Sequence, residues 1–400
     1  MEVSAEYTSV RDQVAIKFGR QLAASLTRPE VREFIKTAVL EQFDGDYNFL
    51  FGTHKDKTLQ VTAPDGRTTE MSFKEVLFGP GAANARSQES AFLDSLATLY
   101  PLLQIALPEL EVATAESWET GSEVPLIAIV PENMEKKGIT TIAAYDTEGN
   151  TYELSVEEEP DKLVIVVSGN EGLIGVEKQA GGRLDCPIDA EPYYTNGNTD
   201  YYIRDDYYNS LNRCNQIAPP GGGNDNPNNC ACQRDCKTTQ EKLFKIKFSD
   251  IEKLRKVEKW VLGKVELEIY LVYGTKNSAG YFTATFAESR KDLRRCQSIW
   301  GNCEPIWRSL NRKFTEFLTD YGSNVVVFMT EVDDFPFTAN KTVVLTTTID
   351  GEVYIHNVSV EVSSPIYKAL GEVEIRYCDQ ADSPGKFYSN NFVDFYWGQD

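Results

Sequence analysis

Residues Val265–Tyr273 read VELEIYLVY, and this stretch decides the fold of the C-terminal part of the chain. Apolar side chains fall on every second position, which is the pattern of a β-strand with one buried face. Six further segments are also predicted to be strands: Leu243–Phe248, Tyr281–Phe286, Val325–Thr330, Thr342–Thr348, Val353–Val362 and Val373–Tyr377. With an amphipathic helix expected around Pro305–Leu318, residues 241–400 are predicted to form an antiparallel β-sandwich with a helical insertion.

Residues 1–124 are predicted to form a mainly helical region. Val10–Leu26 places apolar side chains at a spacing of four, which gives a helix one buried face. A second helix is expected to begin at Pro29, with Thr27 and Glu30 forming a capping box. A third helical stretch covers Ser87–Leu103.

The next two regions differ from the helical part and from each other. Residues 125–180 are predicted to be a small β-rich region, with strands at Pro125–Val130 and Leu163–Val167 and a hairpin between them. Residues 181–240 are rich in Tyr, Asn and Gly and are expected to be a linker or long loop pinned by disulfides. The chain is therefore predicted to be a multidomain protein of the α+β class.

The net charge of −21 limits the partners of the protein. The charge argues against nucleic acid, whose phosphates would be repelled, and against anionic membrane surfaces for the same reason. Cations and neutral ligands such as glycans fit this charge, as does a simple role in solubility. No transmembrane segment is expected, because no run reaches the roughly 18 apolar residues that would span a bilayer.

Histidine is scarce, which restricts catalysis. His54 and His356 are the two histidines of the chain, so a zinc motif that needs a histidine pair is excluded, and a Ser-His-Asp triad would need one of them. His54 is expected in a polar loop and His356 on the surface of a strand. Acidic pairs could serve a glycosidase, but the sequence singles out none, so catalytic residues stay unknown.

The eight cysteines predict an oxidised, exported protein. Five of them lie between Cys186 and Cys236, in or beside the Asn/Gly/Pro-rich stretch. Cys296 and Cys303 flank a short loop and are predicted to form a local disulfide. A zinc site is the alternative for one group of thiols: Cys214, Cys230, Cys232 and Cys236. Their spacing is not a usual zinc pattern, so disulfides are preferred.

Three stretches carry a resemblance to a known group of proteins. They are Leu22–Arg32 leading to Phe43–Tyr47, Ala144–Asp146 through Val164–Glu171, and Glu258–Leu267. Together they resemble uncharacterised secreted or lipid-anchored proteins of Bacteroidota over about a quarter of the chain. The resemblance implies export and a shared architecture, and it brings no established catalytic residues.

Calcium is the best cofactor candidate, since its ligands are carboxylates and carbonyls gathered from loops. The expected ligands follow predicted strands in two loops: Asp333, Asp334, Asp379 and Asp382. The C-terminal part is similar to C2-type β-sandwiches in strand count and acidic loop ends, and this similarity implies calcium at one end of the sheets. The alternative is that these residues are solvated loop acids.

A tyrosine-rich segment is the predicted binding site. Its members are Tyr193, Tyr194, Tyr201, Tyr202, Tyr207 and Tyr208, interleaved with acids and asparagines. Aromatic faces beside amides and carboxylates are typical of sugar-binding grooves. The alternative is that these rings pack onto a neighbouring domain.

These features favour a secreted or cell-surface binding protein whose partner is an extracellular glycan or protein. The alternatives are a histidine-independent secreted hydrolase acting on glycans, and a secreted toxin or membrane-acting protein. An exported protein is expected to have lost its signal peptide, so we expect the printed sequence to begin after it, with Met1 added. The expected location is secreted or anchored at the bacterial cell surface.

Overall fold

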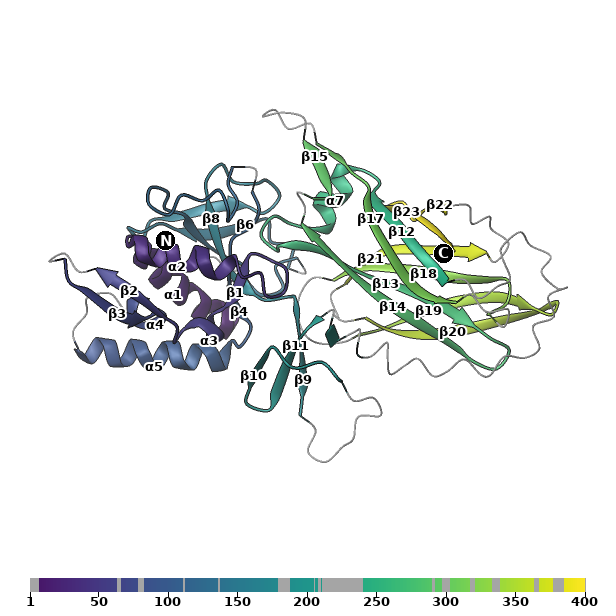
Figure 1. Ribbon diagram of the computed structural model, residues 1–400, viewed down its shortest axis with the longest axis horizontal. Helices are drawn as coiled ribbons and strands as arrows, with labels where there is room; N and C mark the ends of the chain where they lie inside the picture. The colour runs from purple at the N-terminus through teal and green to yellow at the C-terminus, as the bar shows by residue number, and fades with distance from the viewer. Residues whose placement is uncertain are drawn as a thin grey trace. The chain divides into compact units, whose positions relative to one another are not determined.

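A computed structural model describes most of the chain and shows a protein that is mostly β (Figure 1). The described residues are 7–62, 66–77, 83–110, 112–135, 137–178, 188–204, 206–207, 210, 240–289, 292–296, 303–316, 321–332, 339–362, 367–376 and 385–399. The α+β class is confirmed, since helices concentrate in the N-terminal part and strands dominate the C-terminal part.

The chain divides into two compact units. The first comprises residues 1–173, 194–201 and 259–263, and the second comprises 174–193, 202–258 and 264–400. The regions predicted on either side of the boundary at position 124 therefore belong to one unit up to residue 173.

A six-stranded sheet organises the first unit, in the order β1-β4-β8-β5-β6-β7. Its strands are β1 (Asn48–Leu50), β4 (Leu103–Ala106), β5 (Leu126–Ile129), β6 (Thr141–Tyr145), β7 (Thr151–Ser155) and β8 (Val164–Gly169). β5 and β8 pair in parallel, and the other neighbours are antiparallel. β5 and β8 are almost entirely buried, as their continuous apolar runs require.

Three helices pack on this sheet: α1 (Val10–Ser25), α2 (Pro29–Val39) and α3 (Phe51–His54). Two more, α4 (Phe73–Leu77) and α5 (Ala83–Leu99), pack on α1 and on each other. The hydroxyl of Ser9 accepts a hydrogen bond from the backbone N–H of Asp12, and the carboxylate of Asp12 accepts one from the backbone N–H of Ser9. α1 therefore begins with a capping box. α1 packs closely on β5, because a Cβ built on Gly19 would lie 2.1 Å from Cδ1 of Ile129.

The predicted capping box of α2 is wrong. Arg28 is the N-cap residue, and its side chain makes no capping hydrogen bond. The hydroxyl of Thr27 donates instead to the carbonyl of Ala24. Glu30 accepts instead from the backbone of Thr62, in the hairpin of β2 (Thr58–Thr62) and β3 (Thr68–Ser72). A tertiary contact has therefore replaced the local one.

Segment 259–263 belongs to the first unit although it lies far along the chain. Trp260 and Val261 are buried in a cluster with residues of β5, β6 and β8. The indole nitrogen of Trp260 donates to the carbonyl of Ser155 at 2.9 Å, so the polar tip of this buried ring is satisfied.

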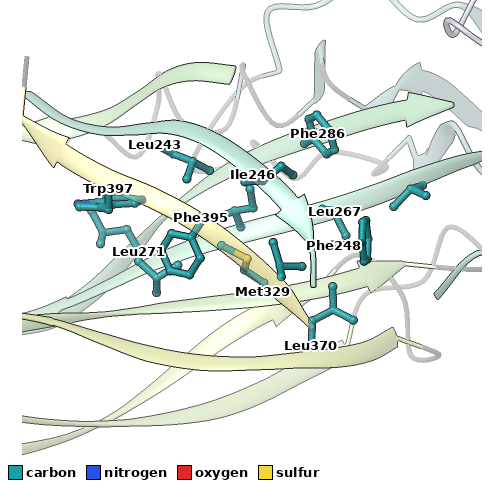
Figure 2. Packing of buried hydrophobic residues seen from close by; sticks show 14 of the residues in the cluster. Leu243, Ile246, Phe248, Leu267, Leu271, Phe286, Met329, Leu370, Phe395 and Trp397 are labelled. Atoms are coloured by element: carbon teal, nitrogen blue, oxygen red, sulfur yellow. The ribbon is translucent and has the colours of Figure 1, made fainter. Parts of the chain in front are cut away.

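Two four-stranded sheets form most of the second unit, in the orders β17-β12-β23-β22 and β14-β13-β18-β21. The strands are β12 (Gln240–Phe248), β13 (Lys264–Gly274), β14 (Ala279–Ser289), β17 (Arg308–Glu316), β18 (Asn324–Val332), β21 (Tyr367–Arg376), β22 (Lys386–Ser389) and β23 (Val393–Gln399). Alternate side chains of both sheets enter one hydrophobic cluster, which Figure 2 shows with Ile246, Leu271, Met329 and Phe395 among its members. All seven predicted strands of this region are present.

Smaller elements complete the second unit. β19 (Ala339–Ile349) and β20 (Glu352–Val362) form a long hairpin whose apolar face meets Tyr270 and Phe328 in a second cluster. α7 (Ile251–Val257) follows β12, and β15 (Arg294–Cys296) pairs with β16 (Cys303–Pro305).

The helix predicted around Pro305–Leu318 is wrong, because β17 lies there and pairs with β12. Leu310 and Phe314 both pack against the core cluster. Their spacing of four fits one helical turn, and it also fits two strand periods. Asn311 has a φ of 50° and coincides with a register shift between the two strands, so a β-bulge bends β17 at this point.

Candidate functional site

An open groove beside α2 is the candidate site of the first unit. Its volume is about 470 Å³. Three parts of the chain line it: α2, the first residues of the hairpin strand β2, and the loop near Thr120. The lining residues are Pro29, Glu30, Glu33, Phe34, Thr37, Leu59, Gln60, Thr120 and Gly121.

Phe34 supplies the aromatic surface of the groove. Its ring stacks on Phe73 with centroids 4.6 Å apart and meets Phe49 edge-on at 6.3 Å. Phe34 is half-buried, whereas Phe49 and Phe73 are fully buried. The two buried rings therefore fix the orientation of an aromatic side chain that still borders the groove.

Cationic side chains of α2 hold the loop at Thr120 and Gly121, which lines one side of the groove. Arg32 is 3% exposed and donates to the carbonyls of Thr120 and Gly121. Lys36 donates to the carbonyl of Trp118 at 2.7 Å. Burial lowers the pKa of Arg32 from its ordinary value. These donors satisfy loop carbonyls that secondary structure leaves free.

The rim of the groove is polar. Glu33 accepts a hydrogen bond from the hydroxyl of Thr120 at 2.6 Å, and Glu30 accepts one from the backbone of Thr62 at 3.2 Å. Each carboxylate thus ties α2 to another wall of the groove and keeps further acceptor capacity. Thr37 is exposed and adds a hydroxyl. The groove can therefore offer acceptors around a single aromatic face.

The prediction that His54 lies in a polar loop is wrong. It ends α3, is 2% exposed, and its ring lies 4.7 Å from Phe49. Burial and the nearby Lys57 lower the pKa of His54 to about 4, so the imidazole is neutral at pH 7. A buried neutral ring of this kind is a structural residue.

His356 lies in β20 opposite Leu345 and is half-buried. Its ring stacks with Tyr354 at a centroid distance of 6.4 Å. The expected cross-strand position is thus present, but the ring is not at the surface as expected: Nε2 is buried, and a Cβ built on Gly274 would lie 2.4 Å from Cδ2.

The predicted tyrosine site falls into separate pairs. Tyr194 and Tyr201 face each other in the hairpin of β10 (Tyr194–Asn196) and β11 (Thr199–Ile203), with rings stacked at 5.8 Å. Tyr201 is 8% exposed, and a Cβ on Gly52 would lie 2.9 Å from the Tyr194 hydroxyl. These two rings therefore pack within the first unit.

The other predicted tyrosines lie in the second unit or outside the described residues. Tyr193 is half-buried, and the rings of Tyr202 and Tyr207 lie 6.2 Å apart. Tyr208 lies outside the described residues. Ligand binding by this segment stays a prediction.

The four expected calcium ligands, Asp333, Asp334, Asp379 and Asp382, also lie outside the described residues. Within the described part, no group of three or more His, Cys, Asp or Glu side chains is placed to hold a metal. Cys296 and Cys303 stand directly opposite each other in the β15–β16 pair, a register that suits their predicted disulfide.

Comparison with known proteins returned no match to a protein-family model, a curated protein or a solved structure. In the described part of the chain, no helix has the length and apolar character needed to cross a membrane. The functional argument therefore rests on the geometry of the groove. Sequence reasoning missed this groove, because its walls come from three separated segments.

Proposed function

We propose that this chain is a secreted or cell-surface binding protein, and that the groove beside α2 takes a neutral polar ligand of the glycan class. The observation that carries the proposal is Phe34, an aromatic ring held by two buried rings while it borders an open groove with carboxylates at its rim. A pyranose ring stacks on such a face, and its hydroxyls donate to carboxylates and amides at the rim.

The size and composition of the groove support this class of ligand. Its volume of about 470 Å³ lies within the range of small-molecule sites. The polar groups of the rim are Glu30, Glu33, Thr37, Gln60 and Thr120. The carboxylates suit hydroxyl donors and disfavour anions, in keeping with a chain of net charge −21.

The two carboxylates of the rim favour binding over the alternative of glycan hydrolysis. Both Glu30 and Glu33 already accept hydrogen bonds that hold the walls of the groove. Both side chains therefore serve to position the walls of the groove, which is a role that suits a binding site.

The proposal extends to the architecture that presents the site. We propose that residues 241–400 are organised as a β-sandwich, since side chains of both four-stranded sheets share one core. We also propose that Cys296 and Cys303 form a disulfide, which an exported protein would retain. A surface-exposed, disulfide-stabilised β-rich chain is typical of extracellular binding proteins.

A panel of immobilised neutral oligosaccharides tests the binding proposal. Thr37→Trp should fill the groove from its exposed side and abolish retention of any oligosaccharide that the unmodified chain binds. Leu40→Trp is the matched control, because Leu40 caps the same helix, is 41% exposed and does not line the groove. It should leave binding unchanged.

Two outcomes contradict the proposal. Equal loss of binding in both tryptophan variants, or no binding to any member of the panel, would remove the groove as a glycan site. Release of new reducing ends from a bound oligosaccharide would instead favour the hydrolase.

A further inference from the structure

The loop between α2 and β1 contains an alternating set of oxygen-bearing side chains. Residues 44–48 read DGDYN, so Asp44, Asp46 and Asn48 occupy every second position. Calcium-binding loops present their first three side-chain ligands at this spacing. The spacing by itself does not make a site.

The fold brings a second segment to this loop. Asn170 follows β8, and its Nδ2 donates to Oδ2 of Asp44 at 2.7 Å and to Oε1 of Gln104 at 3.0 Å. Nδ2 of Asn48 lies 3.1 and 3.2 Å from the two carboxylate oxygens of Asp44. The amide groups of two asparagines therefore meet one carboxylate.

Each of these asparagines leaves an oxygen unsatisfied. Asn48 and Asn170 are both 3% exposed, and within the described part of the chain Oδ1 of neither residue has a hydrogen-bond partner. A buried acceptor without a donor is costly, and two beside the same carboxylate call for an explanation.

A cation supplies that explanation. Rotation of each amide by 180° about its Cβ–Cγ bond would exchange nitrogen and oxygen, and both oxygens would then lie 2.7–3.2 Å from the oxygens of Asp44. Oδ1 of Asn170 would also lie 3.0 Å from Oε1 of Gln104. Oxygens that share a calcium ion at 2.3–2.6 Å are about 3 Å apart. Without a cation that arrangement would be repulsive.

We propose that Asp44, Asn48 and Asn170, together with Asp46, bind one calcium ion. Amide carbonyls and carboxylates are the ligands that calcium prefers, whereas magnesium is held mostly by water and one or two carboxylates. The site differs from the one predicted at Asp333 and its companions.

Two glycines leave room for the loop. A Cβ on Gly172 would lie 2.8 Å from Oδ2 of Asp44, and a Cβ on Gly263 would lie 3.3 Å from Oδ2 of Asp46. Gly263 also has a φ of 102°, which L side chains rarely adopt. Backbone segments far apart in the sequence thus approach both carboxylates directly.

Calorimetric titration of the full chain with calcium chloride, after removal of metal with EDTA, tests the proposal. The expected result is one equivalent of calcium bound, with an unfolding midpoint several degrees higher in calcium than in EDTA. Asp44→Asn should weaken binding at least tenfold. Asp146→Asn is the matched control and should leave calcium binding unchanged. Asp146 also accepts several hydrogen bonds, but it lies in a turn at the surface of the first unit.

Asn170→Asp distinguishes a cation site from a network of hydrogen bonds. It places a second carboxylate against Asp44, so the midpoint in EDTA should fall. If calcium binds there, calcium should restore the midpoint and the affinity should be retained or increased. If the network is only structural, calcium will not rescue the variant, and the proposal is overturned.

Two further results would also overturn it. One is the absence of calcium binding by the unmodified chain. The other is binding that persists in Asp44→Asn and disappears in the double variant Asp333→Asn, Asp334→Asn, which would assign the ion to the loop predicted from the sequence.

Discussion

Nε2 of His54 lies 2.7 Å from the ammonium nitrogen of Lys57, closer than to the carboxylate of Glu41, which is 3.7 Å away. Nδ1 lies 2.8 Å from the hydroxyl of Thr53, which donates to the carbonyl of Leu50. Lys57 therefore donates to a neutral imidazole whose proton is on Nδ1 and points to Thr53.

This relationship predicts that acid destabilises the first unit. The pKa of His54 falls from 6.5 to about 4 on folding. Between these two pH values the imidazole is protonated in the unfolded chain and neutral in the folded chain. The contribution of the neutral His54 to the free energy of unfolding is thus fully present above pH 6.5 and is lost as the pH falls toward 4. Between pH 7 and pH 5 the loss from this residue should be about 2 kcal/mol. Urea unfolding at both values measures it.

His54→Gln should remove that part of the pH dependence. His356→Gln is the control, because it removes the other imidazole of the chain. Equal slopes of stability against pH for the unmodified chain and His54→Gln would show that His54 is charged, or accessible, in the folded protein.

Gly19→Ala should destabilise the first unit although alanine is the better helix former. The gain in helix propensity is about 1 kcal/mol. It is opposed by a Cβ only 2.1 Å from Cδ1 of the fully buried Ile129, and overpacking costs about 1–3 kcal/mol. We expect a net loss in urea unfolding. Ile129→Val deletes that atom, so Gly19→Ala should cost less in the double variant; strictly additive effects would contradict the close contact.

Glu241 and Trp397 should be coupled in the second unit. The indole nitrogen donates to Oε2 of Glu241 at 2.6 Å, and both residues are at most 1% exposed. Glu241→Leu leaves this donor unpaired and should cost about 1–3 kcal/mol, whereas Glu241→Gln keeps an acceptor and should cost less. In a double-mutant cycle with Trp397→Phe, a coupling energy near zero would refute the interaction.

Most of the eight cysteines should be oxidised, with Cys296 and Cys303 paired. Thiol titration under denaturing, non-reducing conditions should detect few free groups, and Cys296→Ser should release one. A chain with most thiols free would remove both the disulfide and the argument for export.

Several elements could be predicted from the sequence because their signals are local. The apolar spacing of α1 predicts its buried face correctly. The alternation of β13 predicts a strand correctly, but its expected single buried face is wrong, because Tyr270 and Val272 on the opposite face are buried in the second cluster. The same logic failed at β17, where a spacing of four between Leu310 and Phe314 suits a helix and a strand equally. There, pairing with β12 selected the strand.

The sites depended on contacts that no local pattern encodes. The D-x-D-x-N spacing is visible at Asp44, but its partner Asn170 comes from the end of β8 and arrives only when the sheet forms. The groove needs α2, β2 and the loop near Thr120, and the pKa of His54 is lowered chiefly because other elements bury the ring. Sequence alone thus determined which faces are apolar, since periodicity acts within a few residues. Tertiary structure decided which polar groups meet and lose water, because those effects require segments far apart in the chain.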